Sequence, residues 1–187
     1  MKVICISGHA RNGKDTTAEL IQKTLWGYGY RVLITHYGDL LKYLCSSLFE
    51  WDGKKDERGR HLLQYIGTDV VRKRDPDFWV SFVVKVLDLF NDRWDYVIIP
   101  DTRFPNEIEV MKAAGHEVIH LRVTRPGFSS GLTEQQMQHS SETSLDGAEP
   151  DYTISNDGSY VDLTLKVLRF VQNYLKAGGG NWLYHGH

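Results

Sequence analysis

Five short apolar runs separated by helical patterns constrain the fold of this 187-residue chain most strongly. The runs cover residues 2–7, 31–36, 96–100, 117–123 and 152–155. Most are continuous and β-branched, which is typical of strands buried on both faces of a parallel sheet. The helical patterns cover residues 14–28, 39–49, 61–73, 77–92, 106–114 and 160–176. Strands that alternate with helices predict an α/β fold, a three-layer sandwich with a parallel five-stranded sheet between helices.

Three segments interrupt this alternation, and we expect all of them within one domain spanning residues 1–187. Residues 51–60 are charged and contain glycines, so they predict an exposed loop. Residues 126–149 are rich in Gly, Ser, Thr and Gln, and are too long for an ordinary connection. Long insertions of this kind in compact domains are often lids or binding loops. Residues 178–187 begin with a glycine run, which favours a flexible tail.

The composition is that of an ordinary globular protein and excludes several function classes. Apolar residues make up 41% and charged residues 25%, with a net charge of −2. This charge gives no global reason to expect nucleic acid as a partner. No stretch approaches the roughly 18 apolar residues of a membrane span, and the N-terminus lacks the pattern of a signal peptide. The two cysteines do not form a disulfide framework, so we expect a reduced cytoplasm.

The segment GHARNGKDTT at residues 8–17 follows the first predicted strand and leads into the first predicted helix. Gly8, Gly13 and Lys14 match the G-x-x-x-x-G-K pattern of phosphate-binding loops. In such a loop the backbone N–H groups and the positive helix end bind phosphates, and the lysine ammonium bridges the outer ones. The sequence therefore predicts a nucleotide phosphate site.

Asp15 stands where this pattern normally has a hydroxyl that reaches magnesium. A carboxylate can hold magnesium through a water, and Thr16 or Thr17 offers a hydroxyl one step further along the helix. Alternatively, Asp15 is a helix N-terminal charge favoured by the dipole. The two roles are compatible.

The strand predicted over residues 96–100 leads directly into Asp101 and Arg103. Ligands of open parallel sheets bind at the carboxyl ends of the strands. A carboxylate there can hold magnesium directly or through water, and an arginine can contact a phosphate through two parallel hydrogen bonds. The structural alternative is an Asp–Arg pair that closes the loop.

Two other patterns have both a ligand-binding and a structural interpretation. Gln64 and Thr68 lie four residues apart on one predicted helical face, so both can address one ligand, or they form a plain exposed stripe. Trp79 fits the core of an amphipathic helix better than a stacking platform. The pair His116 and His120 lies in a strand region, where four residues span about 13 Å, and this spacing excludes a helical zinc pair.

Taken in order, several blocks resemble the deoxynucleoside monophosphate kinases of the phage and bacterial type, a phosphate-loop kinase family. The blocks are GHARNGKDTTA, YGDLLK at 37–42, RHLLQYIGTDVVR at 60–72, DPDFWV at 75–80, VIIPDTRFPNE at 97–107, HSSE at 139–142 and ISNDGS at 154–159. YGDLLK departs from the family's F-A-D-P-L-K motif, because Gly38 replaces alanine and Leu40 replaces proline. Together the blocks cover most of the chain.

The resemblance implies ATP-dependent phosphorylation of a (deoxy)nucleoside 5′-monophosphate to the diphosphate, with ATP and Mg²⁺ as cofactors. The catalytic residues implied are Lys14, Asp101, Arg103 and Arg125. ATP would contact Gly8, Arg11, Asn12, Gly13, Lys14, Asp15, Thr16, Thr17, Asn156 and Gly158, and magnesium would contact Asp15, Thr16 and Asp101. The nucleotide acceptor would contact Asp39, Lys42, Arg60, Gln64, Thr68, Arg72 and Arg103, within an acceptor-binding region over about residues 38–80.

Two parts of this implied site have structural alternatives. Arg125 borders a lid over about residues 125–149, where an arginine would close over the transferring phosphoryl group and help exclude water. It is otherwise a solvated cation beside Arg122. The segment Asn156-Asp157-Gly158 would contact adenine, although this sequence is also a favourable turn for its own sake.

Other functions stay open from the sequence. A dephospho-coenzyme A kinase or phosphomevalonate kinase shares the loop, sheet and lid. A non-catalytic nucleotide-binding regulator shares the loop but needs no constellation of Asp39, Lys42, Gln64 and Arg103. We expect no nucleic-acid or membrane partner, and a monomer or homodimer. The preferred base and sugar are not predicted.

Overall fold

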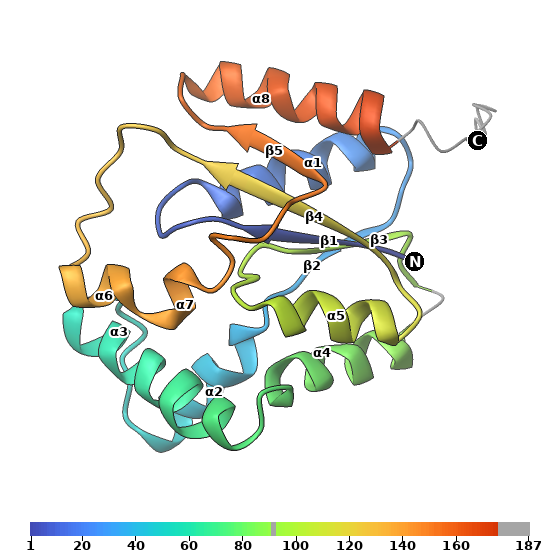
Figure 1. Cartoon of the computed structure of the whole chain (residues 1–187). Coiled ribbons are helices and arrows are strands. Elements are labelled where there is room, and N and C mark those ends of the chain that lie inside the picture. The colour runs from blue at the N-terminus through green and yellow to red at the C-terminus, as the bar shows by residue number, and fades with distance from the viewer. Residues whose placement is uncertain (91–92, 176–187) are drawn as a thin grey trace.

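A five-stranded parallel sheet forms the centre of the computed structural model, which describes residues 1–90 and 93–175 (Figure 1). Its strands are β1 (Lys2–Ser7), β2 (Val32–Ile34), β3 (Tyr96–Ile99), β4 (Glu117–Thr124) and β5 (Tyr152–Ser155). Their order is β2-β3-β1-β4-β5, and every neighbouring pair is parallel. The predicted α/β fold is confirmed, with each predicted strand within two residues of the observed one.

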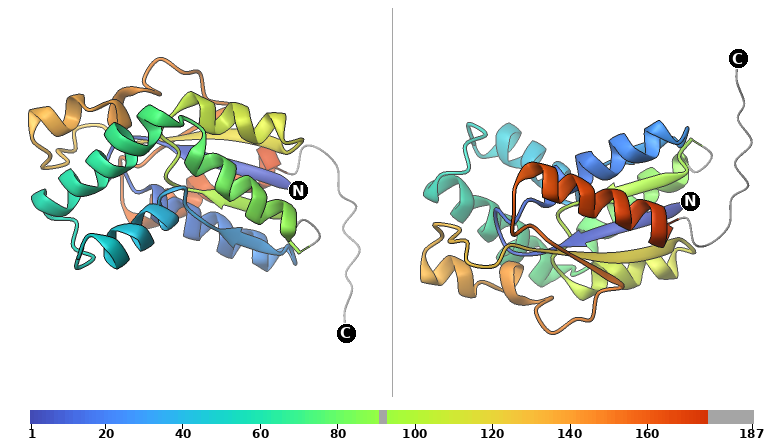
Figure 2. Two further views of the ribbon diagram at one scale, coloured as in Figure 1. Left: turned by 90° about the horizontal axis from the view of Figure 1, so that it is seen from below. Right: turned by 90° about the horizontal axis from the view of Figure 1, so that it is seen from above.

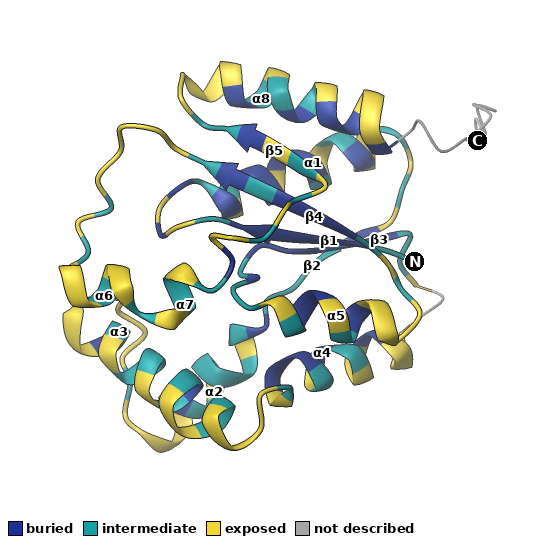
Figure 3. Cartoon of the chain, in the orientation of Figure 1, coloured by how far each residue is buried: buried dark blue, intermediate teal, exposed yellow. Residues whose placement is uncertain are grey.

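Helices cover both faces of this sheet (Figure 2). One face carries α1 (Lys14–Gly27), α8 (Tyr160–Arg169) and the π-helical η2 (Phe170–Leu175), and the other carries α4 (Phe78–Leu89) and α5 (Pro105–Ala113). Successive β1 side chains enter opposite cores, because strand residues alternate between faces. Ile4 and Ile6 pack with α1 and α8, whereas Val3 and Cys5 pack with α4 and α5. All four are fully buried, as the continuous apolar run predicts (Figure 3).

The remaining helices lie around the carboxyl ends of the strands (Figure 1). They are α2 (Gly38–Leu48), α3 (Glu57–Gln64), the π-helical η1 (Tyr65–Arg72), α6 (Glu134–Gln138) and α7 (Ser140–Thr143). The loop after β1 emerges at the middle of this edge, because β1 lies between β3 and β4. Residues far apart in the sequence therefore meet around one loop.

One local prediction was wrong, and a second was right about a helix but not about its type. The exposed loop predicted over 51–60 ends early, because the Asp56 side chain accepts a hydrogen bond from the Gly59 N–H (2.8 Å) and begins α3 at Glu57. The predicted helix over 61–73 is the end of α3 followed by η1, whose wider π-helical turn is common at functional sites.

The long segment over residues 126–149 is not structureless, since it contains α6 and α7. Thr133 caps α6 by accepting a hydrogen bond from the Gln136 N–H (3.2 Å). The tail predicted over residues 178–187 lies outside the described residues, as do the last residues of the helices predicted over 77–92 and 160–176. Within the described ranges, no helix is both long and apolar enough to cross a membrane.

Candidate functional site

The loop between β1 and α1 depends on its two glycines. Gly8 has a φ of 137°, and a Cβ there would lie 2.2 Å from the carbonyl oxygen of Val123 in β4. Gly13 has a φ of 94°, and a Cβ there would lie 2.6 Å from the side-chain amide nitrogen of Asn156. Only glycine satisfies both the left-handed backbone and the close approach. The predicted loop therefore packs directly on β4 and on the segment after β5.

Lys14 is folded back into this loop at the start of α1. Its Nζ donates hydrogen bonds to the carbonyl oxygens of Gly8 (2.7 Å) and His9 (2.9 Å). Burial, together with the smaller effect of the positive charge of Arg103, lowers the pKa of Lys14 to about 8. The loop thus encloses a cation whose solvation is poor, which favours an anion beside it.

Three side chains fix the loop to its surroundings. Asn12 donates to the Val123 carbonyl (3.2 Å), and Asn156 donates to the Asn12 carbonyl (3.0 Å). Arg11 has a left-handed φ of 64° and donates to the Ser130 carbonyl (2.8 Å), so it joins the loop to the segment that carries α6. The amide nitrogen of Asn156, predicted to meet adenine, is thus already bonded to the loop.

Two cavities adjoin the loop. The first cavity, of about 400 Å³, extends from the loop to α2, α3, η1 and α7. The second cavity, of about 430 Å³, lies toward α8 and is lined by Arg11, Gly13, Lys14, Asp15, Thr16, Arg125, Asn156, Gly158, Tyr160 and Leu163. Arg11, Lys14 and Asp15 line both. The loop lysine therefore stands where two binding spaces meet.

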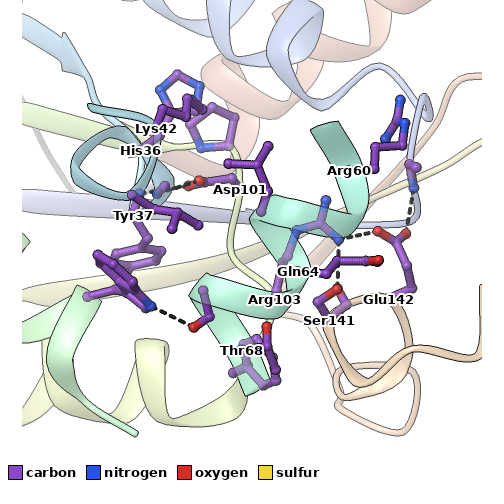
Figure 4. A pocket seen from close by; sticks show the side chains of 18 of the residues that line it. His36, Tyr37, Lys42, Arg60, Gln64, Thr68, Asp101, Arg103, Ser141 and Glu142 are labelled. Carbon is purple, nitrogen blue, oxygen red and sulfur yellow. Dashed lines mark hydrogen bonds and ion pairs between the residues drawn. The ribbon is translucent and has the colours of Figure 1, made fainter. Parts of the chain in front are cut away.

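The first cavity collects most of the residues predicted for an acceptor (Figure 4). Its walls include Lys42, Arg60, Gln64, Thr68, Arg72, Asp101 and Arg103, together with Lys55, which was not predicted. Asp39 is absent from the described residues that line it, and instead accepts hydrogen bonds from Lys42 (2.8 Å) and from the His36 backbone N–H (3.1 Å). These contacts orient the neighbouring cation Lys42 and do not place Asp39 against an acceptor.

Trp79 forms part of the floor of the first cavity and belongs to the core, as predicted. It is 3% exposed, and its Nε1 donates to the Gly67 carbonyl in η1 (2.9 Å). A Cβ at Gly67 would lie 2.6 Å from a methyl carbon of Leu41 in α2. These contacts hold η1 close to α2, and they fix the helical face that carries Thr68.

Asp101 was predicted to contact magnesium, but in the structure its carboxylate accepts hydrogen bonds from the backbone. Its Oδ1 accepts from the Tyr37 N–H (2.9 Å) and its Oδ2 from the Gly38 N–H (2.9 Å), so it holds the N-terminus of α2 (Figure 4). A carboxylate oxygen can accept a second contact, but a metal would meet oxygens that are already hydrogen-bonded. Asp101 is thus an anchor for the N-terminus of α2, and its predicted role as a metal ligand stays a prediction.

Arg103 projects from the loop after β3 toward α7 (Figure 4). Its Nη1 donates to the Ser141 carbonyl (2.6 Å) and forms an ion pair with Glu142. The other carboxylate oxygen of Glu142 accepts the Ala10 N–H of the loop (2.9 Å). Arg103 and the loop are therefore joined through one carboxylate. The Asp101–Arg103 pair, which was the structural alternative to a ligand-binding role, is not among the ion pairs of the described residues.

Arg72 is held by a buried carboxylate that was not predicted. Glu107 is 1% exposed and accepts from Arg72 Nη2 (2.6 Å), the Arg103 N–H (2.7 Å) and the Phe104 N–H (3.1 Å). The Arg72 guanidinium also lies 4.0 Å from the centroid of the Phe104 ring. Burial raises the pKa of Glu107 to about 7, and the positive charge of Arg72 opposes this shift.

Asp15 lies at the mouth of the loop with its side chain 75% exposed. Its Oδ1 is 3.2 Å from His36 Nε2, and this hydrogen bond lowers the pKa of Asp15 and raises that of His36. Thr16 lines the second cavity, but Thr17 is fully buried and its hydroxyl contacts no partner in the described part of the chain. Thr17 is therefore wrong as a phosphate or metal contact, because the helix turns it into the core.

Arg125 lies on the second cavity and not on the first. Its guanidinium is 4.0 Å from the centroid of the Phe128 ring, and its Nη1 lies 3.5 Å from the Arg11 carbonyl oxygen. The prediction that it closes over the transferring group is not supported by this position. Within residues 1–90 and 93–175, no cluster of three or more His, Cys, Asp or Glu residues is arranged to hold a metal.

Besides Lys55, three site residues were missed, and each of these three had a signal in the sequence. His36 is the last residue of the second predicted strand, at the ligand edge of the sheet. Glu107 ends the VIIPDTRFPNE block, and Glu142 ends the HSSE block. The two sequence blocks include Glu107 and Glu142, but the roles of these residues depend on contacts with segments distant in the sequence.

Comparison with known proteins agrees with the resemblance seen in the sequence. The family described as deoxynucleotide monophosphate kinase matches residues 51–167. The deoxynucleotide monophosphate kinase of Enterobacteria phage T4 is 42% identical over 117 residues, which are 58% of this chain and 46% of the phage protein. That of Escherichia phage RB69 is 36% identical over 115 residues, 60% of this chain and 44% of the relative. The matches span about half the length of these relatives.

Solved structures show the same fold at low sequence identity. The APS kinase CysC of Mycobacterium tuberculosis, in complex with AMPPNP and APS, has a TM-score of 0.53 at 14% identity, over 92% of this chain and 98% of the other. Shikimate kinase from Aquifex aeolicus has a TM-score of 0.51 at 13% identity, over 95% and 99%. Both are kinases, and they support the three-layer fold alone.

Proposed function

Because the chain belongs to the deoxynucleotide monophosphate kinase family, we propose that it transfers the γ-phosphoryl group of ATP to a deoxynucleoside 5′-monophosphate. The observation that carries this proposal is that Lys14 lines both cavities. A kinase of this type must bring two anionic nucleotides together end to end, and a cation between two adjoining spaces meets that need. A nucleotide-binding regulator needs no cavity for an acceptor, which is the role proposed here for the first cavity.

ATP occupies the second cavity in this proposal. Gly8–Lys14 supplies backbone N–H groups for the phosphates, Arg125 and Tyr160 border the nucleoside side, and Lys14 contacts the outer phosphates. The lowered pKa of Lys14 favours anion binding, because a phosphate replaces the water that the ammonium has lost. The residue thereby stabilises charge on the group in transfer.

The acceptor monophosphate occupies the first cavity. Arg103 and Arg72 are the proposed partners of its phosphate, because both are positioned by Glu107, one through its backbone and the other through its guanidinium. Gln64 and Thr68 then face the base or the sugar from α3 and η1. Within this proposal the acceptor-binding region over residues 38–80 keeps its predicted role, and residues 125–149 form the lid without Arg125 closing over the transferring group.

The residues at the loop fit a magnesium ion that arrives with the nucleotide phosphates. Asp15 offers an exposed carboxylate, and Thr16 offers a hydroxyl on the second cavity. Hard oxygen ligands of this kind suit magnesium, which keeps several waters and bridges phosphate oxygens. When bound, the ion neutralises charge on the phosphates. Asp101 would act through water, since both of its oxygens already accept backbone N–H groups.

Release of ADP in a coupled assay, over a panel of deoxynucleoside and nucleoside monophosphates, tests this function. We expect at least one deoxynucleoside monophosphate to stimulate ATP turnover, and Lys14→Ala to abolish it without loss of the folded state. Dephospho-coenzyme A and phosphomevalonate are tested beside this panel. If only one of them stimulated ATP turnover, the protein would be another kind of small-molecule kinase. A failure of every acceptor to stimulate turnover would contradict a kinase role.

The setting proposed for this activity is the cytoplasm, with free nucleotides as substrates and a monomer or homodimer as the active form. Cys5 and Cys45 are both buried free thiols, which suits a reducing compartment. The net charge of −2 gives no support for a nucleic-acid partner.

A further inference from the structure

Glu142 places a carboxylate in the part of the site that is built for anions. Its two oxygens contact the Ala10 N–H of the loop (2.9 Å) and the Arg103 guanidinium (Figure 4). The side chain is only 6% exposed, although it belongs to a short helix in a largely exposed segment. A buried carboxylate needs partners of this kind to offset its lost hydration. The contact is therefore a specific one.

Both partners of Glu142 are groups that a phosphate would use. Ala10 lies in the phosphate-binding loop, and Arg103 is the arginine proposed for the acceptor phosphate. A carboxylate and a phosphate each present oxygens that accept charge-assisted hydrogen bonds from such donors. Two anions cannot share them without strong repulsion. A phosphate that binds to these donors must displace the Glu142 carboxylate.

Arg103 does not need Glu142 to stay in place. Its Nη1 also donates to the Ser141 carbonyl (2.6 Å), and its backbone N–H is held by Glu107 (2.7 Å). The Glu142 carboxylate is thus an additional anion on a guanidinium that has other anchors. Loss of the Glu142 contact would therefore leave Arg103 in position, so this contact can be exchanged for one with a phosphate.

We propose that Glu142 is an internal substitute for a substrate phosphate, exchanged for that phosphate when a nucleotide binds. Displacement of the carboxylate removes the side-chain tie between α7 and the loop, and so couples phosphate binding to the position of the segment that carries α6 and α7. The inference rests on the proposed role of the loop as a phosphate site, and it does not depend on which nucleotide is the acceptor.

The test is the affinity for inorganic pyrophosphate, measured by isothermal titration calorimetry without added metal. Glu142→Gln preserves the shape of the side chain but removes its charge, so it competes poorly for Arg103. We expect pyrophosphate to bind the variant about tenfold more tightly than the wild-type protein, which corresponds to about 1.4 kcal/mol. Unchanged or weaker binding would overturn the proposal and make Glu142 a fixed part of the phosphate site.

Glu134→Gln is the matched control, because Glu134 is an exposed residue of α6 and its substitution changes the net charge equally. Its affinity for pyrophosphate should stay within about twofold of wild type. A gain as large as that of Glu142→Gln would mean that any lost negative charge has this effect, and would overturn the proposal. Glu142→Asp keeps the charge but retracts the carboxylate by one methylene. It should also bind pyrophosphate more tightly than the wild-type protein. This variant therefore tests the proposal even if Glu142→Gln does not fold.

The affinity gain should also depend on Arg103. In an Arg103→Gln background, Glu142→Gln should raise pyrophosphate affinity by less than it does in the wild-type background, because one of the two shared donors is gone and only the Ala10 N–H remains. A full tenfold gain in that background would contradict the exchange. These are binding measurements without an acceptor, so their outcome is independent of the coupled kinase assay.

Discussion

Glu107 offers the sharpest test of how the first cavity is built. It accepts one hydrogen bond from Arg72 and two from the backbone N–H groups of Arg103 and Phe104, and its side chain is 2% exposed. The Arg72 side chain is 11% exposed, so the pair is nearly dry. Glu107→Ala leaves a buried guanidinium and two backbone N–H groups without their acceptor.

Removal of one partner from a buried ion pair costs about 3–5 kcal/mol. Domains are stable by about 5–15 kcal/mol, so we expect Glu107→Ala to lose about a fifth or more of the free energy of unfolding. The control is Glu117→Ala, which breaks the 3.0 Å contact with Lys2 at a side chain that is 61% exposed. An exposed pair of this kind contributes about 1 kcal/mol or less.

The assay is equilibrium unfolding in urea at pH 8, above the pKa of about 7 given for Glu107, followed by tryptophan fluorescence. Arg72→Met separates the two contributions of Glu107, since it removes the ion pair and leaves both backbone hydrogen bonds in place. It should therefore cost less than Glu107→Ala. If Glu107→Ala and Glu117→Ala lowered stability equally, within about 0.5 kcal/mol, the buried network would have no special role.

Three further predictions concern the loop and the cavity floor. At pH 8, the protein should take up about 0.5 proton when it binds pyrophosphate, because the pKa of Lys14 is lowered to about 8 and an anion favours its charged form. Calorimetry in buffers of different ionisation enthalpy measures this uptake, and Lys14→Met should show none. Gly8→Ala should cost at least about 2 kcal/mol more than Gly115→Ala in urea unfolding, since Gly115 also has a positive φ but open space for a Cβ; equal losses would refute the close approach to β4. Trp79→Phe should cost about 1–3 kcal/mol by leaving the Gly67 carbonyl without its donor, and an unchanged midpoint would contradict that bond.

The fold was predictable because its signals are local. Continuous apolar runs identify buried parallel strands, and the loop glycines precede a helix that begins at Lys14 as expected. The start of α3 was missed, because a single Asp56 cap outweighs a charged and glycine-containing stretch. The π-helical turns of η1 were also missed, since hydrophobic spacing does not distinguish them from an α-helix over so few residues.

The site was predictable as a set of residue types, but not as a set of partners. The structural alternative paired Arg103 with Asp101 nearby in sequence, yet Arg103 pairs with Glu142, which is 39 residues away. Asp101 instead binds the N-terminus of α2, at Tyr37 and Gly38. Sequence spacing fixes which residues reach the edge of the sheet, whereas the pairing there depends on how α2 and α7 fold over it.

The chain has a negative net charge, whereas cations line the first cavity, and two buried carboxylates explain this difference. A net charge of −2 gives no sign of an anion site, yet Lys14, Arg72 and Arg103 all line the first cavity. Glu107 holds Arg72 through a contact that no phosphate needs to break, because it also anchors the backbone of α5. Glu142 balances Arg103 through the very donors that a phosphate would use. One carboxylate therefore positions a cation for substrate, and the other must leave before substrate can bind.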